Sequence, residues 1–96
     1  MKPSHALSLH RLAVLKAVEQ YRATNLRVFG SARNQSDTES SDLDLLVDVL
    51  PGATLFDLGG LQDELQELLG MRVDLLTPAD LPPEFRTIVL AEAKPI

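Results

Sequence analysis

Apolar residues near the start of the chain recur every three or four positions, which is the period of an amphipathic helix. The stretch "SLHRLAVLKAVEQYRATN" shows this spacing over residues 8–25. Ser8 is placed to act as the N-cap of the helix, and Asn25 is placed to end it. The apolar side of this predicted helix carries Leu12, Leu15 and Val18, followed one turn later by Tyr21 or Arg22.

Two further helices are predicted in the second half of the chain. In "TLFDLGGLQDELQELLG", residues 54–70, leucines recur at three- and four-residue steps, and Gly70 stands where a helix would end. Gly59 and Gly60 would each cost this helix about 1 kcal/mol relative to Ala, so the pair indicates a late helix start or the close approach of another backbone. The stretch "PPEFRTIVLAEA", residues 82–93, begins with prolines, which suit a first helical turn. The apolar positions of these two helices are Leu55, Leu58, Leu61, Leu65 and Leu68 in one, and Phe85, Ile88 and Val89 in the other.

Three short runs rich in Leu and Val predict β-strands between the helices. They are "LRVF" before Gly30, "DLDLLVDV" before the Pro51-Gly52 turn, and "MRVDLLT" before Pro78. The polar residues 31–41 between the first two runs are expected to form a loop or a short helical turn. The resulting order is helix, strand, loop, strand, helix, strand, helix. It predicts an α/β fold with a small mixed sheet of three or more strands packed by helices.

Length and composition narrow the possible functions. The 96 residues suit one domain with a single modest core, so residues 1–96 are expected to bind their ligands as one unit. No apolar run approaches the roughly 20 residues of a membrane helix, and no signal-peptide pattern is present, so a cytoplasmic protein is expected. The absence of cysteine excludes disulfides and thiolate metal sites. A net charge of −5 argues against a large nucleic-acid footprint.

Two acids, Asp42 and Asp44, stand one residue apart at the head of the second predicted strand. Because side chains alternate along a strand, both project from one face while Leu43 projects from the other. Their Cα atoms should lie about 6.6 Å apart, two rises of roughly 3.3 Å, which allows both to reach ions about 3.5–4 Å apart. Asp74 in the third run would complete a triad if that strand lies beside the second. All-oxygen ligands suit Mg²⁺ or Mn²⁺ and not Zn²⁺, whereas the plainer interpretation makes these acids solvated residues at strand ends.

The pair Gly30-Ser31 at the end of the first strand offers what a phosphate group requires. A glycine lets backbone N–H groups approach an anion closely, and the serine adds a hydroxyl donor at a helix start. No lysine follows the glycine, so the pair is not a P-loop. Taken alone, it would be read as an ordinary turn.

Counted along the chain, these residues form the pattern G-S-x10-D-x-D. With it, the sequence resembles the DNA-polymerase-β-like nucleotidyltransferase superfamily, and specifically its minimal nucleotidyltransferase branch. The resemblance runs in order through "VFGSAR", "SDLDLLVD", "TLFDLGGLQDELQELLG" and "RVDLLT". It implies a polymerase-β-like fold with a nucleotide held by Gly30 and Ser31, and with Mg²⁺ and the catalytic chemistry at three carboxylates: Asp42, Asp44 and Asp74.

Two neighbouring residues qualify the resemblance. Arg33 matches a basic position of the motif and is expected near the nucleotide phosphates or a partner. Asn34 stands where many members have glycine, which affects the expected shape of the loop and not the chemistry.

The chemistry that the resemblance implies is transfer of AMP from ATP to an acceptor hydroxyl, with two Mg²⁺ ions clamping the displacement and Asp74 as general base. Members of the branch that the sequence resembles are similar to the antitoxin partners of HEPN-domain toxins, and some add AMP to a tyrosine of the toxin, so the resemblance implies such a partner. Alternatives are a catalytically silent module that neutralises such a partner by contact, and transfer to a small molecule. The latter is disfavoured because enzymes of that kind usually carry a second domain. The base preference and the oligomeric state, homo- or hetero-oligomeric, stay open.

Several polar residues are set aside. His5 and His10 do not have the spacing of a helical metal pair and are expected at the surface. Asp48 shares the acidic face but lies too far along its strand to join the cluster. The run "SDTES", residues 36–40, is expected to be a solvated loop.

Overall fold

A four-stranded mixed sheet forms the centre of the computed structural model, which describes residues 1–96. Its strand order is β3-β2-β1-β4, with β2 and β3 parallel and the other two pairs antiparallel. The elements follow one another as α1 (Pro3–Leu9), α2 (Arg11–Gln20), β1 (Ala23–Phe29), the 3₁₀ helix η1 (Gly30–Asn34), β2 (Leu43–Val49), α3 (Leu55–Leu69), β3 (Val73–Leu76), the 3₁₀ turn η2 (Pro78–Asp80), α4 (Pro83–Glu92) and β4 (Lys94–Pro95). The expected mixed sheet packed by helices is therefore confirmed.

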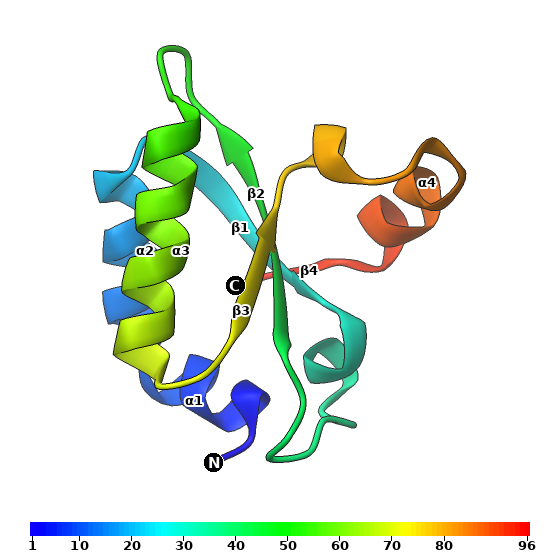
Figure 1. Cartoon of the computed structure of the whole chain (residues 1–96). Coiled ribbons are helices and arrows are strands. Elements are labelled where there is room, and N and C mark those ends of the chain that lie inside the picture. Colours follow the sequence, from blue (N-terminus) through cyan, green and yellow to red (C-terminus); the bar gives the residue numbers. More distant parts are fainter.

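The two faces of the sheet differ. Helices α2 and α3 lie side by side against one face, and α4 lies on the opposite side (Figure 1). Alternation along β2 sends its apolar side chains toward α2 and α3, where they are fully buried with residues of both helices: Leu43, Leu45, Val47, Val14, Leu61 and Leu65. Burying one such side chain is worth about 1.5–3 kcal/mol, so this face holds the fold together. The other face of β2 carries Asp44, Leu46 and Asp48.

The opposite face of β2 is closed along part of its length. Leu46 projects from this face and is fully buried, although it lies outside the main core cluster. Leu81, between η2 and α4, is likewise buried outside that cluster. The segment that follows β3 therefore covers the middle of this face, while the beginning of β2 stays open to solvent.

The first predicted helix is two helices, and its predicted ends are wrong. Pro3 occupies the first turn of α1, and the chain breaks at His10 before α2 begins. Ser8 therefore lies inside α1 and is not an N-cap, while Asn25 lies in β1 with a positive φ of 54°. Leu12, predicted on the apolar side, is 77% exposed because α2 turns Val14, Ala17 and Val18 toward the core instead.

Helix α3 begins at Leu55 and ends before Gly70, which the sequence predicted as its end. Thr54 and Asp57 form a reciprocal capping box at its start, so a late start does not explain the glycine pair. A Cβ added at Gly60 would lie 2.7 Å from Cε1 of Tyr21, which shows that the close neighbour is an aromatic side chain and not a backbone.

The C-terminal elements depart furthest from expectation. Helix α4 has no buried residue, and Phe85 and Ile88 are exposed. The short strand β4 was not predicted; it pairs with β1, and the N–H of Ile96 donates to the carbonyl of Leu26 at 3.0 Å. None of the helices combines the length and apolarity needed to cross a membrane.

Candidate active site

The parallel pair of β2 and β3 brings three acids to the open face of the sheet. Their register places Leu43 beside Val73 and Asp44 beside Asp74. Asp42 directly precedes β2 and is two residues from Asp44, so by alternation both project from the same face. Because Leu43 and Val73 are buried against the helices, the three carboxylates point away from the core. Neighbouring parallel strands lie about 4.8 Å apart, so Asp44 and Asp74 are adjacent.

Gly30 lies directly against Asp44. It follows the last residue of β1, Phe29, which pairs with Asp44 across the sheet. Gly30 has a φ of +71°, and a Cβ placed on it would lie 2.3 Å from Oδ2 of Asp44. The absence of a side chain is thus required twice, by the left-handed backbone and by the carboxylate. Ser31 follows in the first turn of η1, so the Gly-Ser pair borders the carboxylates.

The three carboxylates repel one another, and a single nearby cation, Arg72, offsets only part of this repulsion. Partial burial raises the pKa of Asp44, and the charges of Asp74 and Asp42 raise it further. No three acidic or histidine side chains converge on one point as a ready-made metal cage. Instead, the guanidinium of Arg72 lies between two of them: its Nε is 3.9 Å from Oδ2 of Asp42 and 3.5 Å from Oδ1 of Asp74.

The donor set nevertheless suits a hard divalent cation. All three side chains offer carboxylate oxygens, which Mg²⁺ and Mn²⁺ prefer, and no sulfur or imidazole lies among them. The side chains of Asp42 and Asp74 are 49% and 37% exposed, so their oxygens can turn toward an ion without leaving a packed site. The carboxylate of Asp44 takes the space that a side chain at Gly30 would fill, so the glycine lets Asp44 hold its present position.

Arg33 is not joined to these carboxylates by any hydrogen bond or ion pair. Its Nε donates to the carbonyl of Glu92, and its Nη1 donates to Oδ1 of Asn34 at 2.6 Å. Arg33 therefore ties η1 to the end of α4. Gln35, which directly follows η1, takes a left-handed conformation with φ 57°.

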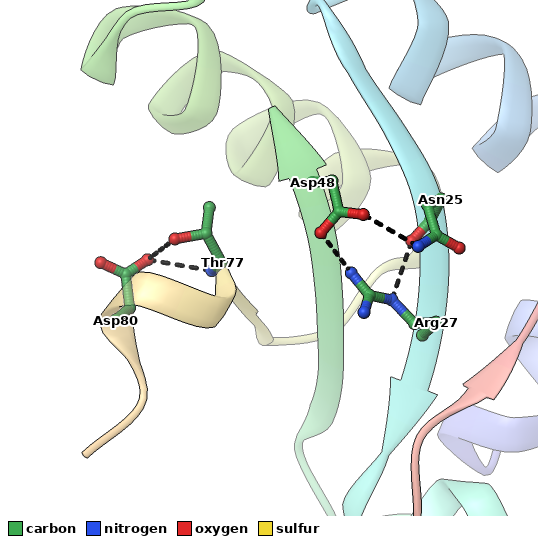
Figure 2. Close-up of polar contacts among 5 residues, drawn as sticks. All are labelled: Asn25, Arg27, Asp48, Thr77 and Asp80. Carbon is green, nitrogen blue, oxygen red and sulfur yellow. Dashed lines mark hydrogen bonds and ion pairs between the residues drawn. The ribbon is translucent and has the colours of Figure 1, made fainter. Parts of the chain in front are cut away.

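Asp48 belongs to a separate polar cluster farther along β2 (Figure 2). Its carboxylate accepts from Nη2 of Arg27 at 2.7 Å and from Nδ2 of Asn25 at 2.9 Å. The hydrogen bonds from Asn25 and Arg27, together with the charge of Arg27, outweigh burial and lower the pKa of Asp48. The carboxylate of Asp48 is thus bound by two residues of β1, Asn25 and Arg27, at the irregular part of that strand. This agrees with the exclusion of Asp48 from the candidate site.

The turn that leaves β3 is fixed by its own polar contacts. Oδ2 of Asp80 accepts from the N–H and the hydroxyl of Thr77, both at 2.9 Å (Figure 2). This capping box directs the chain from β3 through η2 toward α4.

Two residues with specific polar contacts, one at the site and one away from it, were missed in the sequence. Arg72 could have been found, because strand alternation places it on the same side as Asp74. Asp37 could not: it lies in the run expected to be solvated, yet it is only 2% exposed. Its oxygens accept from the N–H and the hydroxyl of Ser4, each at 2.8 Å, and this partner lies 33 residues away.

Comparison with known proteins places this arrangement in a class. The family model of the nucleotidyltransferase domain matches residues 12–96. A protein of Methanocaldococcus jannaschii, provisionally named a protein adenylyltransferase, is 41% identical over 66 residues, which cover 69% of this chain and 71% of that protein. Protein adenylyltransferase MntA of Thermococcus cleftensis is 35% identical over 74 residues, covering 77% of this chain and 75% of that protein.

Solved structures agree. A structure provisionally assigned as a minimal nucleotidyltransferase is 42% identical, with a TM-score of 0.87 over 97% of this chain and 95% of that one. A toxin-antitoxin crystal structure with AMP-PNP shares the fold alone, at 19% identity and a TM-score of 0.71 over 85% of this chain and 68% of that one.

The fold and the sequence match define a nucleotidyltransferase domain, and the chain belongs to that family. Within it, the chain is a member of the minimal nucleotidyltransferases.

Proposed function

We propose that residues 1–96 act as one nucleotidyltransferase domain that transfers AMP from ATP to an acceptor hydroxyl. The observation that carries the proposal is the juxtaposition of Asp44 and Asp74 in the parallel register, with Asp42 on the same face and Gly30 against Asp44. Relatives named protein adenylyltransferase support the nature of the transferred group. The toxin-antitoxin crystal structure that shares this fold contains AMP-PNP, which agrees with an adenine nucleotide as donor.

In this proposal, Asp42, Asp44 and Asp74 hold two Mg²⁺ ions, or Mn²⁺ in their place. Bound divalent ions would lower the pKa of the acceptor hydroxyl and neutralise the leaving pyrophosphate. Partial burial raises the pKa of Asp44, and the charges of Asp74 and Asp42 raise it further; such ions would relieve the repulsion among the three carboxylates.

Residues of this chain would bind the nucleotide phosphates and accept the proton of the acceptor. The backbone N–H groups around Gly30 and the hydroxyl of Ser31 bind phosphate oxygens, while Arg33 braces the helix that carries them. Asp74 accepts the proton of the acceptor hydroxyl, whose oxygen attacks the α-phosphorus in line. The bond from the α-phosphorus to the bridging oxygen breaks, and pyrophosphate leaves.

A protein hydroxyl is the acceptor best supported here. The structure has two cavities: a groove of about 390 Å³ between α2 and α3, lined by residues such as Lys16 and Glu64, and one of about 300 Å³ behind η1. Neither is lined by any of the three carboxylates, so this chain does not enclose a small acceptor at the site. We therefore propose that another polypeptide completes the acceptor side, namely a HEPN-type toxin modified on a tyrosine.

One assay separates this proposal from a silent binding module. The protein is incubated with ATP, Mg²⁺ and the partner toxin, and the toxin's intact mass and toxicity are then measured. Wild type is expected to add AMP and abolish toxicity, whereas Asp42→Asn should do neither. Asp63→Asn, an equal charge change on the exposed side of α3, should behave as wild type. If Asp42→Asn neutralises the toxin fully and no AMP is added by wild type, the chain acts by contact alone.

A further inference from the structure

Arg72 lies next to the three carboxylates, beside Asp42 and one strand position before Val73. It directly precedes β3, and its carbonyl accepts the N–H of Leu43 at 3.1 Å, which fixes its backbone beside the start of β2. Since Val73 faces the core, alternation turns Arg72 and Asp74 to the open face. The parallel register then sets Arg72 beside Asp42 in the same way that Asp74 lies beside Asp44.

Arg72 is the only basic residue with an ion pair to these acids. The other ion pairs of the structure join the N-terminus to Glu39 and Arg27 to Asp48. The side chain of Arg72 is 71% exposed and makes no hydrogen bond in the structure that would lock it. Exposed pairs of this kind are weak, so the guanidinium can leave the carboxylates readily.

We propose that Arg72 is the built-in counterion of the carboxylate site. In the metal-free protein it neutralises Asp42 and Asp74, and it must be displaced before a divalent cation can use their oxygens. Once displaced, the guanidinium remains on the same face and can pair with a phosphate oxygen of the nucleotide, since it is a strong bidentate donor for phosphate. The inference rests on the proposed function, because it takes these carboxylates as the metal site.

This exchange has a measurable consequence. A cation that arrives alone must break both ion pairs of Arg72 without replacement, whereas a cation that arrives with nucleotide offers the guanidinium a new anion. Metal binding should therefore be weak alone and strengthened by nucleotide. Removal of the guanidinium should strengthen binding of the metal alone and reduce this dependence on nucleotide.

The first test measures the dissociation constant of Mn²⁺ with and without a non-hydrolysable ATP analogue. Without nucleotide, Arg72→Gln should bind Mn²⁺ about two- to tenfold more tightly than wild type, as expected from two exposed ion pairs. Arg72→Lys keeps the charge and should stay near wild type. Lys16→Gln removes a charge from the groove between α2 and α3 and should have little effect. Equal affinity for Mn²⁺ in wild type and Arg72→Gln would overturn the inference, and so would an equal gain of affinity in Lys16→Gln. Failure of both wild type and Arg72→Gln to bind Mn²⁺ would also overturn it.

The second test requires no metal. The change in Tm caused by Arg72→Gln is measured in wild type and in an Asp74→Asn background, both in EDTA. A counterion role predicts a larger fall in Tm when Asp74 is present, and equal changes in both backgrounds would refute it. These measurements stand apart from AMP transfer: protein that binds Mn²⁺ and shows the coupling but transfers no AMP would reject the proposed function and leave the role of Arg72 intact.

Discussion

Replacement of Gly30 by Ala should damage the site in a way that its backbone strain alone does not explain. Gly30 has a φ of +71°, and the Cβ of an alanine would lie 2.3 Å from Oδ2 of Asp44. Such contacts are essentially never shorter than 3.0 Å, so the carboxylate would have to move by about 0.7 Å from the position it now takes. The substitution thus combines a backbone penalty with a displaced metal-ligand candidate.

The two effects have different sizes and different readouts. An L-residue in the left-handed region costs roughly 1–2 kcal/mol, which lowers the Tm of a domain of this size by about 4–8 °C per kcal/mol. The displaced carboxylate adds little to unfolding, because Asp44 is only half-buried. Its effect falls on function: misplacement by about 1 Å can cost on the order of 10²-fold in rate.

Gly70→Ala is the matched control. Gly70 has a nearly identical φ of +69°, but nothing lies within 4 Å of the added Cβ. Thermal unfolding with and without Mn²⁺ and an ATP analogue should show similar losses of Tm for both variants in the apo protein. Ligand-dependent stabilisation should persist in Gly70→Ala and be lost in Gly30→Ala. Full ligand stabilisation in Gly30→Ala would refute the close packing of Asp44 on Gly30 as a requirement of the site.

Two further predictions concern the scaffold. Gly59→Ala should raise the Tm, since Ala is favoured by about 1 kcal/mol over Gly in an open helical position. Gly60→Ala should not raise it, because the added Cβ would meet the ring of Tyr21. Equal gains of Tm in differential scanning calorimetry would contradict this contact. For Asp37, burial would raise the pKa, but hydrogen bonds from the N–H and hydroxyl of Ser4 outweigh it and hold the pKa below its usual range. The stabilisation is therefore present above the unfolded pKa of about 3.9 and is lost as pH falls through the lower folded value. Asp37→Asn should cost roughly 1–3 kcal/mol at pH 7 in urea unfolding, and this difference from wild type should shrink in acid; a difference that does not change with pH would contradict the charge-based account.

The strands and the acidic face were predictable because they depend on local alternation. Leu43 and Asp44 differ in environment simply by successive positions in a strand, and a period of two carries that information in the sequence. The end of α3 at Gly70 is equally local. Alternation along the sequence could not predict which strands pair with one another in the sheet.

The errors lie where distant residues decide. Leu12 has the right period for a core position, but the break at His10 rotates α2 so that it faces solvent. Asp37 looks like part of a solvated loop until Ser4, 33 residues away, accounts for its burial. Strand β4 is two residues long and exists only because β1 has a free edge beside it, which no two-residue pattern can indicate.

The two ends of β2 show why the position of an acid in a sequence does not settle its role. Asp44 and Asp48 share one face of one strand, yet their pKa values move in opposite directions. Asp48 has its charge satisfied by Arg27 and Asn25, so its ionised form stabilises the fold and has little left to offer a ligand. At Asp44, burial and two like charges raise the pKa, so the ionised form is disfavoured in the folded protein. A divalent cation would relieve that repulsion at Asp44, and Asp48 has no such repulsion to relieve, which is the physical reason why we propose the metal site at the beginning of the strand.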